Sequence, residues 1–222
     1  MKSMMRKIRS QDVGDIGIGA MIIFIAMVLI AGIAAAVLIQ TANRLESQAM
    51  TTGEQTKGEV ATGLYVIDVE GEYGTRNISG VFVSGLHNIT ITVSPRAGSL
   101  DIDLNTTVVE ISDSTKKCLL KYSGTYAVEP ANAGVFATSA FDLEPYGFGV
   151  IELEDADGSS SATTPVLNRG DKVMITVNLS AVFGGLSERV DVWGQILPEE
   201  GSPGIFAFRT PAAYTKVVYD LY

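Results

Sequence analysis

A long stretch without charge near the N-terminus constrains this 222-residue chain more than any other feature. No Asp, Glu, Lys or Arg occurs between Asp15 and Arg44, and most residues of that stretch are apolar. As a helix, residues 16–39 alone would be roughly 36 Å long at about 1.5 Å per residue, which is enough to cross the hydrocarbon layer of a bilayer. The chain must therefore provide this segment with an apolar environment of lipid or protein.

The charges on either side of this stretch predict its orientation. Lys2, Arg6, Lys7 and Arg9 precede it, and basic residues that flank a membrane helix tend to stay in the cytoplasm. The helix then leads outward, so everything after about Leu45 is expected outside the membrane. The precursor is thus expected to be inserted in the membrane for a time.

An ordinary secretory signal fits the segment poorly. The apolar core of such a signal has about 7 to 15 residues and ends in small residues at the cleavage site. Here Ala34, Ala35 and Ala36 are small, but Val37, Leu38 and Ile39 continue the apolar run beyond them. A plain uncleaved membrane anchor remains an alternative.

Small residues recur among the large ones of the apolar run. They are Gly17, Gly19, Ala20, Ala26, Ala31, Gly32, Ala34, Ala35 and Ala36. Small side chains let helix backbones approach closely, so dispersion contacts accumulate where apolar surface alone gives no preference for protein over lipid. The pattern therefore predicts a helix that exchanges lipid for identical helices.

After the helix, which we expect to end at Gly63, the hydrophobic period changes to alternation. Ile89, Ile91 and Val93 alternate with threonine, and the same pattern recurs in residues 172–179 and 188–197. We expect strands at Leu64–Glu70, Ile78–Ser84, Ile89–Ser94, Val108–Ser112, Cys118–Tyr122, Val150–Glu154, Lys172–Leu179, Glu188–Leu197 and Phe206–Thr210. The predicted fold class is α+β, with a long N-terminal hydrophobic helix followed by an all-β, immunoglobulin-like sandwich.

Two parts of the sequence resemble archaeal flagellins (archaellins), which are type IV pilin-like filament subunits. One part is Gly14 followed by Asp15-Ile16-Gly17-Ile18-Gly19-Ala20 and the apolar run, and the other is residues 193–198 with Gly201–Gly204 and Thr210-Pro211. Bacterial type IV pilins carry Phe and Glu at the first and fifth mature positions, where this chain has Asp15 and Gly19.

The resemblance implies a domain organisation and a function. Residues 1–14 are a leader that a membrane peptidase removes between Gly14 and Asp15, residues 15–63 form the assembly helix, and residues 64–222 form the outer domain. The mature chain is then a structural subunit of an extracellular archaeal motility filament. Its partners are identical or homologous flagellin subunits, the leader peptidase and the membrane assembly and motor machinery. An adhesive pilus subunit and a membrane-anchored surface binding domain are the alternatives.

The composition agrees with an extracellular location. The formal net charge of −9 becomes −12 without the leader, because Lys plus Arg falls from 16 to 12 and Asp plus Glu from 25 to 24. Nucleic acid is not an expected partner, since its phosphates would repel this charge.

The outer domain contains four N-glycosylation patterns. They start at Asn77, Asn88, Asn105 and Asn178, and none has proline at the middle position. We expect a glycan on at least one of them, and Asn178 is expected on the polar side of its strand.

Catalytic and metal-binding chemistry has little support in the sequence. Cys118 is the only cysteine and is expected to be buried, and His87 is the only histidine and is expected in an exposed turn. The pairs Asp101/Asp103 and Asp155/Asp157 lack the full EF-hand pattern, so we expect solvated loop carboxylates. We therefore predict no enzyme activity, no cofactor and no metal.

Overall fold

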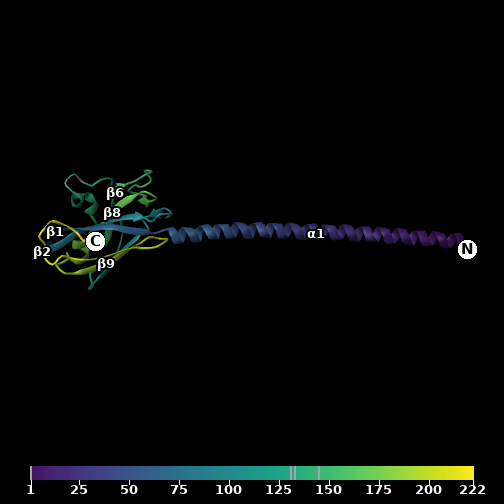
Figure 1. The fold of residues 1–222 in the computed structure, drawn as a ribbon, viewed down its shortest axis with the longest axis horizontal. Coiled ribbons are helices and arrows are strands. Elements are labelled where there is room, and N and C mark those ends of the chain that lie inside the picture. Colours follow the sequence, from purple (N-terminus) through teal and green to yellow (C-terminus); the bar gives the residue numbers. More distant parts are fainter. Residues whose placement is uncertain (1, 131, 133, 145) are drawn as a thin grey trace. The chain divides into compact units, whose positions relative to one another are not determined.

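The computed structural model describes the backbone of residues 2–130, 132, 134–144 and 146–222, and the side chains of this set from residue 17 onward (Figure 1). The chain divides into two compact units, residues 1–55 and residues 56–222. The first consists of helix α1, Lys2–Ala61, whose last residues belong to the second unit. The second contains all the strands. The expected long apolar helix followed by a sheet-rich domain is confirmed.

Eleven strands occur in the described residues of the second unit. They are β1 Leu64–Ile78, β2 Val81–Pro95, β3 Ile102–Asp103, β4 Val108–Ser112, β5 Lys117–Ala127, β6 Gly147–Glu154, β7 Val166–Leu167, β8 Lys172–Asn178, β9 Asp191–Leu197, β10 Gly204–Arg209 and β11 Val218–Asp220. Short helices are η1 Val135–Ala137, η2 Ser139–Phe141 and α2 Leu179–Phe183.

Nine of these strands form one continuous sheet in the order β10-β9-β4-β5-β6-β8-β2-β1-β11, while β3 and β7 form a separate pair. Neighbouring strands of the large sheet are antiparallel except β5 and β6, which are parallel. The sheet curves so that β10 approaches β1, where the backbone N–H of Leu64 donates to the carbonyl of Ser202 and an added Cβ at Gly204 would touch Val66. The layers of the expected sandwich are thus parts of one curved sheet.

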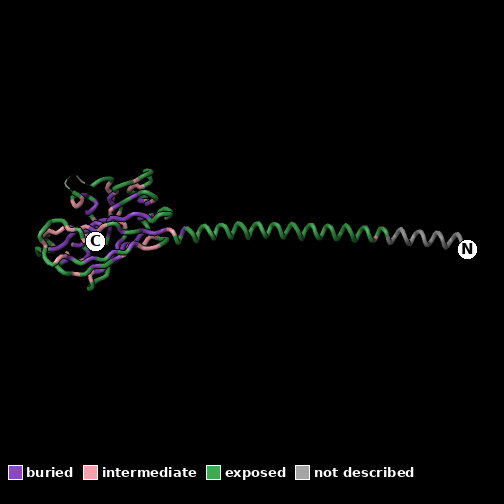
Figure 2. Tube along the Cα trace, in the orientation of Figure 1, coloured by how far each residue is buried: buried purple, intermediate pink, exposed green. Residues whose placement is uncertain are grey.

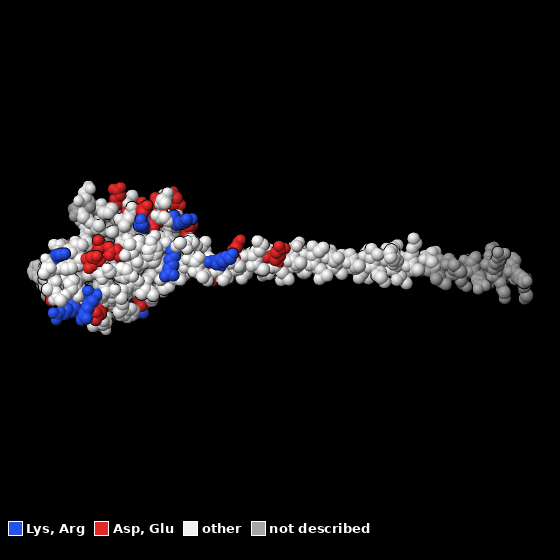
Figure 3. Space-filling view, in the orientation of Figure 1, with Lys and Arg blue, Asp and Glu red and all other residues white. Residues whose placement is uncertain are grey.

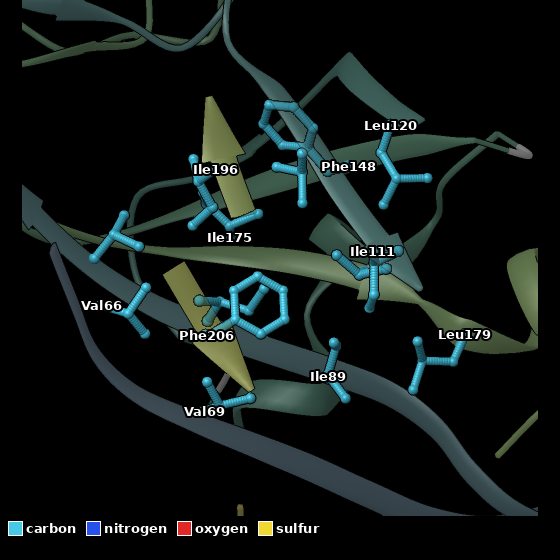
Figure 4. Close-up of a cluster of buried hydrophobic side chains, with 14 of the residues drawn as sticks. Val66, Val69, Ile89, Ile111, Leu120, Phe148, Ile175, Leu179, Ile196 and Phe206 are labelled. Carbon is cyan, nitrogen blue, oxygen red and sulfur yellow. The ribbon is translucent and has the colours of Figure 1, made fainter. Parts of the chain in front are cut away.

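One hydrophobic core lies inside this curve (Figure 4). It receives alternate side chains from β1, β2, β4, β5, β6, β8, β9 and β10, as the strand period of two requires. Figure 4 shows members of this core, including Val69, Ile111, Phe148, Ile175 and Phe206. Fully burying one such side chain contributes about 1.5–3 kcal/mol, so this cluster is the main source of stability in the second unit.

The outer face of β6, β8 and the second part of β5 is also covered. Ala140 and Phe141 of η2 pack on Ile151 in a second cluster, and the hydroxyl of Thr176 donates to the carbonyl of Ala140 at 2.6 Å. Thr90 and Thr92 of β2 point away from the core and are buried as well.

The structure corrects two expected elements. The strand expected at Ile78–Ser84 is wrong, because Ser79 and Gly80 form a turn with positive φ angles of 54° and 89° that joins β1 to β2. Successive residues of positive φ match the twist of a two-residue hairpin turn. The strand expected to reach Leu179 ends at Asn178, which caps α2 instead. Strands β3, β7 and β11 were not expected.

Candidate assembly interface

Helix α1 carries apolar side chains on all its sides, and the described part of it is almost entirely exposed (Figure 2). Phe24 is 67% exposed and Ile33 is 57% exposed. Gly17–Ala61 contains a window with a mean hydropathy of 3.1, which is long and apolar enough to cross a membrane. A helix that is apolar all round is stable only when lipid or other protein surrounds it. This surface is therefore the strongest candidate for an interface in the described part of the chain.

The small residues of α1 have no packing role within a single chain. A Cβ added to Gly17, Gly19 or Gly32 would meet nothing within 4 Å. Ala20, Ala26, Ala31 and Ala35 are exposed as well. Glycine costs about 1 kcal/mol relative to alanine in a helix, so its use here needs a reason outside the isolated subunit.

The expected cleavage pair, Gly14 and Asp15, lies outside the residues whose side chains the structure describes.

The end of α1 is fixed to the β domain by contacts within the second unit. The backbone N–H of Thr62 donates to the carbonyl of Gly58 at 2.7 Å, and the Thr62 hydroxyl oxygen accepts from the N–H of Leu100 at 3.1 Å. Gly58 is buried, and a Cβ there would lie 2.6 Å from the Leu100 side chain. The helix ends at Ala61, two residues before the expected Gly63.

The four glycosylation patterns lie in different environments. Asn77 and Asn105 are exposed, whereas Asn88 is only 1% exposed and its amide nitrogen donates to the Glu72 carboxylate at 2.9 Å. Asn178 is half-buried, and its side-chain oxygen accepts from the N–H of Ala181 as the cap of α2. The folded domain thus leaves no room for a glycan at Asn88, while Asn77 and Asn105 are open.

His87 is buried within β2, so the expectation of an exposed turn was wrong. Its Nε2 lies 3.1 Å from the carbonyl of Gly74 and 3.0 Å from that of Val83, and its Nδ1 lies 2.7 Å from the Ser180 hydroxyl. Because carbonyls only accept, Nε2 carries the proton and Nδ1 accepts from Ser180. Burial lowers the pKa of His87 below its usual value.

Three carboxylates lie close together, two from the loop after β6 and one from the turn before β8. Oxygens of Asp155, Asp157 and Asp171 lie within 4.8 Å of one another, and Asp171 was not part of the expected pair. Each already accepts from the chain's own donors: Asp155 from the N–H of Gly158 at 2.8 Å, and Asp171 from the N–H of Asn168 at 2.8 Å. These hydrogen bonds explain the cluster as a way of ordering the loop. Asp101 and Asp103 are not in this group, and Asp103 accepts from the N–H of Asn105.

The described side chains form no arrangement typical of a catalytic site. Cys118 is 4% exposed and faces the core, as expected. Both nitrogens of His87 are occupied by structural hydrogen bonds. A nucleophile with a free neighbouring base is therefore absent from the described residues.

The chain matches the family model described as archaeal-type flagellin over residues 14–208. Flagellin B2 of Methanocaldococcus jannaschii is 45% identical to it over 204 residues, which cover 90% of each chain.

Two solved structures resemble this one. The crystal structure of archaeal flagellin FlaB1 from Methanocaldococcus jannaschii has a TM-score of 0.62 at 32% identity and covers 72% of this chain and 97% of its own. The structure of the archaeal flagellum of Methanospirillum hungatei strain JF1 has a TM-score of 0.58 at 15% identity and covers 92% of this chain and 98% of its own, which is a likeness of fold.

Proposed function

Because this chain belongs to the archaeal-type flagellin family, we propose that it is a structural subunit of an archaeal motility filament and that it polymerises through α1. One observation carries the proposal: residues 17–39 of α1 are apolar on every side of the helix, and that surface is exposed in the described chain. The subunit itself catalyses no reaction.

Assembly moves α1 from lipid into a bundle of identical helices. In lipid the large apolar side chains already have an apolar environment. The free energy gained when the helix leaves the bilayer therefore comes from close packing at the small residues. Once the filament stands in water, the same side chains hold it together, because each fully buried Ile, Leu or Phe contributes about 1.5–3 kcal/mol. A subunit pulled from the bundle would expose all of them at once.

The precursor, in this proposal, is inserted in the membrane with its basic leader in the cytoplasm. A leader peptidase then cuts between Gly14 and Asp15, and the mature helix passes to the assembly machinery. Removal of Lys2, Arg6, Lys7 and Arg9 takes away four charges that a water-free bundle could not accommodate.

The β domain forms the outer sheath of the filament. Its exposed Asn77 and Asn105 are the positions that we propose for glycans, together with the half-buried Asn178. Asn88 is withdrawn as a candidate because its amide is buried and hydrogen-bonded.

N-terminal sequencing and electron microscopy of filaments shed from cells test this function together. The filament subunit should begin at Asp15, and Gly32→Arg should abolish filaments because it places an unpaired charge in the bundle. The matched variant Gly32→Ala should retain them. Filaments of normal number and length from Gly32→Arg would refute the role of α1, and a subunit that begins at Met1 would refute the cleavage.

A further inference from the structure

The outer face of the curved sheet is covered on one half and bare on the other. Residues of η1 and η2 cover β6, β8 and the second part of β5, where Ala127 packs on the η2 cluster. On the other half, formed by β10, β9, β4 and residues 117–121 of β5, three large apolar side chains are exposed. Trp193 is 46% exposed, Leu119 is 56% exposed and Ile205 is 66% exposed.

The bare half also carries basic side chains. Lys117 and Lys121 alternate with Leu119 on β5, and Arg209 is exposed on β10. Lys117 bonds Glu110 at 2.6 Å and lies over the Trp193 ring at 5.9 Å, while Arg209 pairs with Asp191 at 3.4 Å. Lys121 has no ion pair among the described residues. We call this surface, formed by Lys117, Leu119, Lys121, Trp193, Ile205 and Arg209, the basic face.

The other end of the strand order has the opposite character. A groove of about 360 Å³ lies beside β1 and β11 and is lined by Glu70, Glu72, Val135, Phe136, Val217 and Val218 among others. Val217 is 63% exposed and Val218 is 45% exposed, so its walls are apolar and open. We call this surface the acidic groove. Figure 3 shows that acidic side chains on the visible face of the β domain gather in clusters rather than spreading evenly.

Glu70 in the acidic groove and its neighbour Asp220 form no ion pair among the described residues. Glu70 lies directly opposite Asp220 in the β1–β11 pair, and like charges at such a position are destabilising. Burial, together with the Asp68 and Asp220 carboxylates, raises the pKa of Glu70. Arg76 bonds Glu72 at 3.1 Å but forms no described ion pair with Glu70 or Asp220. Thr90, opposite Glu70, has a buried hydroxyl without a described partner. This end of the sheet therefore favours the arrival of a cation.

We propose that the basic face of one subunit docks on the acidic groove of a second copy of this chain. The two surfaces match in charge, because Lys121 on one and Glu70 and Asp220 on the other form no ion pair among the described residues, and both offer exposed apolar side chains to bury. They are different surfaces at opposite ends of one strand order, so the contact is heterologous. A heterologous contact whose rotation does not close into a ring leaves one surface free on each end subunit and extends as an open helix. The inference rests on the proposed filament function and adds a contact between its outer domains.

Charge exchange between the two surfaces tests this contact in filaments made by the full chain. Glu70→Lys and Lys121→Glu should each lower the fraction of subunit found in filaments at least about tenfold, because like charges then meet at every interface. The double variant should restore filaments, since each interface of a homopolymer then contains the exchanged pair. The control Glu144→Lys changes an exposed carboxylate outside both surfaces and should have no such effect.

The milder variant Glu70→Gln separates the contact from folding. It removes the repulsion from Asp220, so disassembled full-length subunits in detergent micelles should melt at a higher temperature, while the filaments should melt at a lower one. Filaments as stable as the natural ones in every single variant, or a double variant as defective as the singles, would overturn the docking contact. The proposed function would stand in that case, because it is tested by the variants of α1.

Discussion

At the scale of single residues, His87 shows how a polar side chain can hold distant segments together. It lies in β2, its two ring nitrogens reach Gly74 in β1, Val83 in β2 and Ser180 in α2, and its side chain is fully buried. All these bonds require a neutral ring with the proton on Nε2. A second proton on Nδ1 would force the Ser180 hydroxyl to turn round and would charge a buried ring.

His87 should therefore make the β domain sensitive to acid. Its folded pKa is lowered, so the unfolded chain binds the proton more tightly, and the stability due to this residue is complete above its ordinary value of 6.5. That stability is lost as the pH falls through 6.5 toward the folded pKa, at a slope of at most about 1.4 kcal/mol per pH unit. Urea unfolding between pH 7.5 and 5 measures it.

The variant His87→Gln is the comparison, because it removes the titration but keeps a polar side chain. It should be less stable than the natural chain at pH 7.5 by about 1–3 kcal/mol, since buried donors and acceptors lose partners. The difference between the two proteins should shrink at pH 5. Parallel stability curves for the two proteins would mean that His87 does not titrate in this range.

The glycosylation patterns give a second prediction for single residues. Mass spectrometry of peptides from purified filaments should find glycans at Asn77 or Asn105 and none at Asn88, whose amide nitrogen bonds Glu72. Asn77→Gln should leave the unfolding free energy of the domain within about 0.5 kcal/mol. Asn88→Gln should lower it by about 1–3 kcal/mol because the buried hydrogen bonds to Glu72 and Arg76 are disturbed. A glycan on Asn88 would show that the hairpin is modified before it folds.

At the scale of elements, α1 contains a matched pair of glycines for testing the helix bundle. A Cβ at Gly32 and a Cβ at Gly53 both meet nothing within 4 Å in the subunit, but Gly32 lies in the uncharged run and Gly53 lies after it. Gly32→Leu makes the helix more apolar and more helical, so membrane insertion is kept. In filaments it should nevertheless prevent close approach of neighbouring helices.

Gly32→Leu is thus expected to reduce filament number strongly in electron micrographs, while Gly53→Leu should leave it near the natural level. Membrane fractionation of the precursor should show both variants inserted, which excludes a failure before assembly. Equal filament numbers from the two variants would argue that the small residues are not at a packing interface.

Some of these elements could be predicted from sequence and others could not, for a physical reason. The helix and strand β4 follow from local patterns, and β4 has the expected bounds Val108–Ser112. The pair Ser79-Gly80 favours a turn, but the alternating apolar residues beside it predicted a strand through this position. Strand β11 forms only because β1 offers an edge to it, and His87 is buried by α2, far along the chain. Long-range pairings of this kind leave little trace in a local window.

At the scale of the whole molecule, the two units contribute differently to the proposed assembly. Residues 56–222 carry 11 Lys and Arg against 21 Asp and Glu, a net charge of −10, so free β domains repel one another. The proposed contact between the basic face and the acidic groove has to overcome that repulsion. It can do so in a filament, because the helix bundle holds neighbouring β domains at a high effective concentration.

A fragment of residues 56–222 tests this dependence. It keeps the core cluster and the contacts of Gly58 and Thr62 with the β domain, so it should unfold in a single cooperative transition. Size-exclusion chromatography at micromolar concentration should show a monomer, because the contact acts alone once α1 is removed. Added salt should not produce filaments, since screening the net charge does not replace the apolar area that the helices bury. If the fragment polymerised by itself, the outer contact would drive assembly and α1 would only direct it. If the fragment stays monomeric, the helices provide the stability of the polymer, and the contact between β domains sets only how neighbouring subunits are aligned.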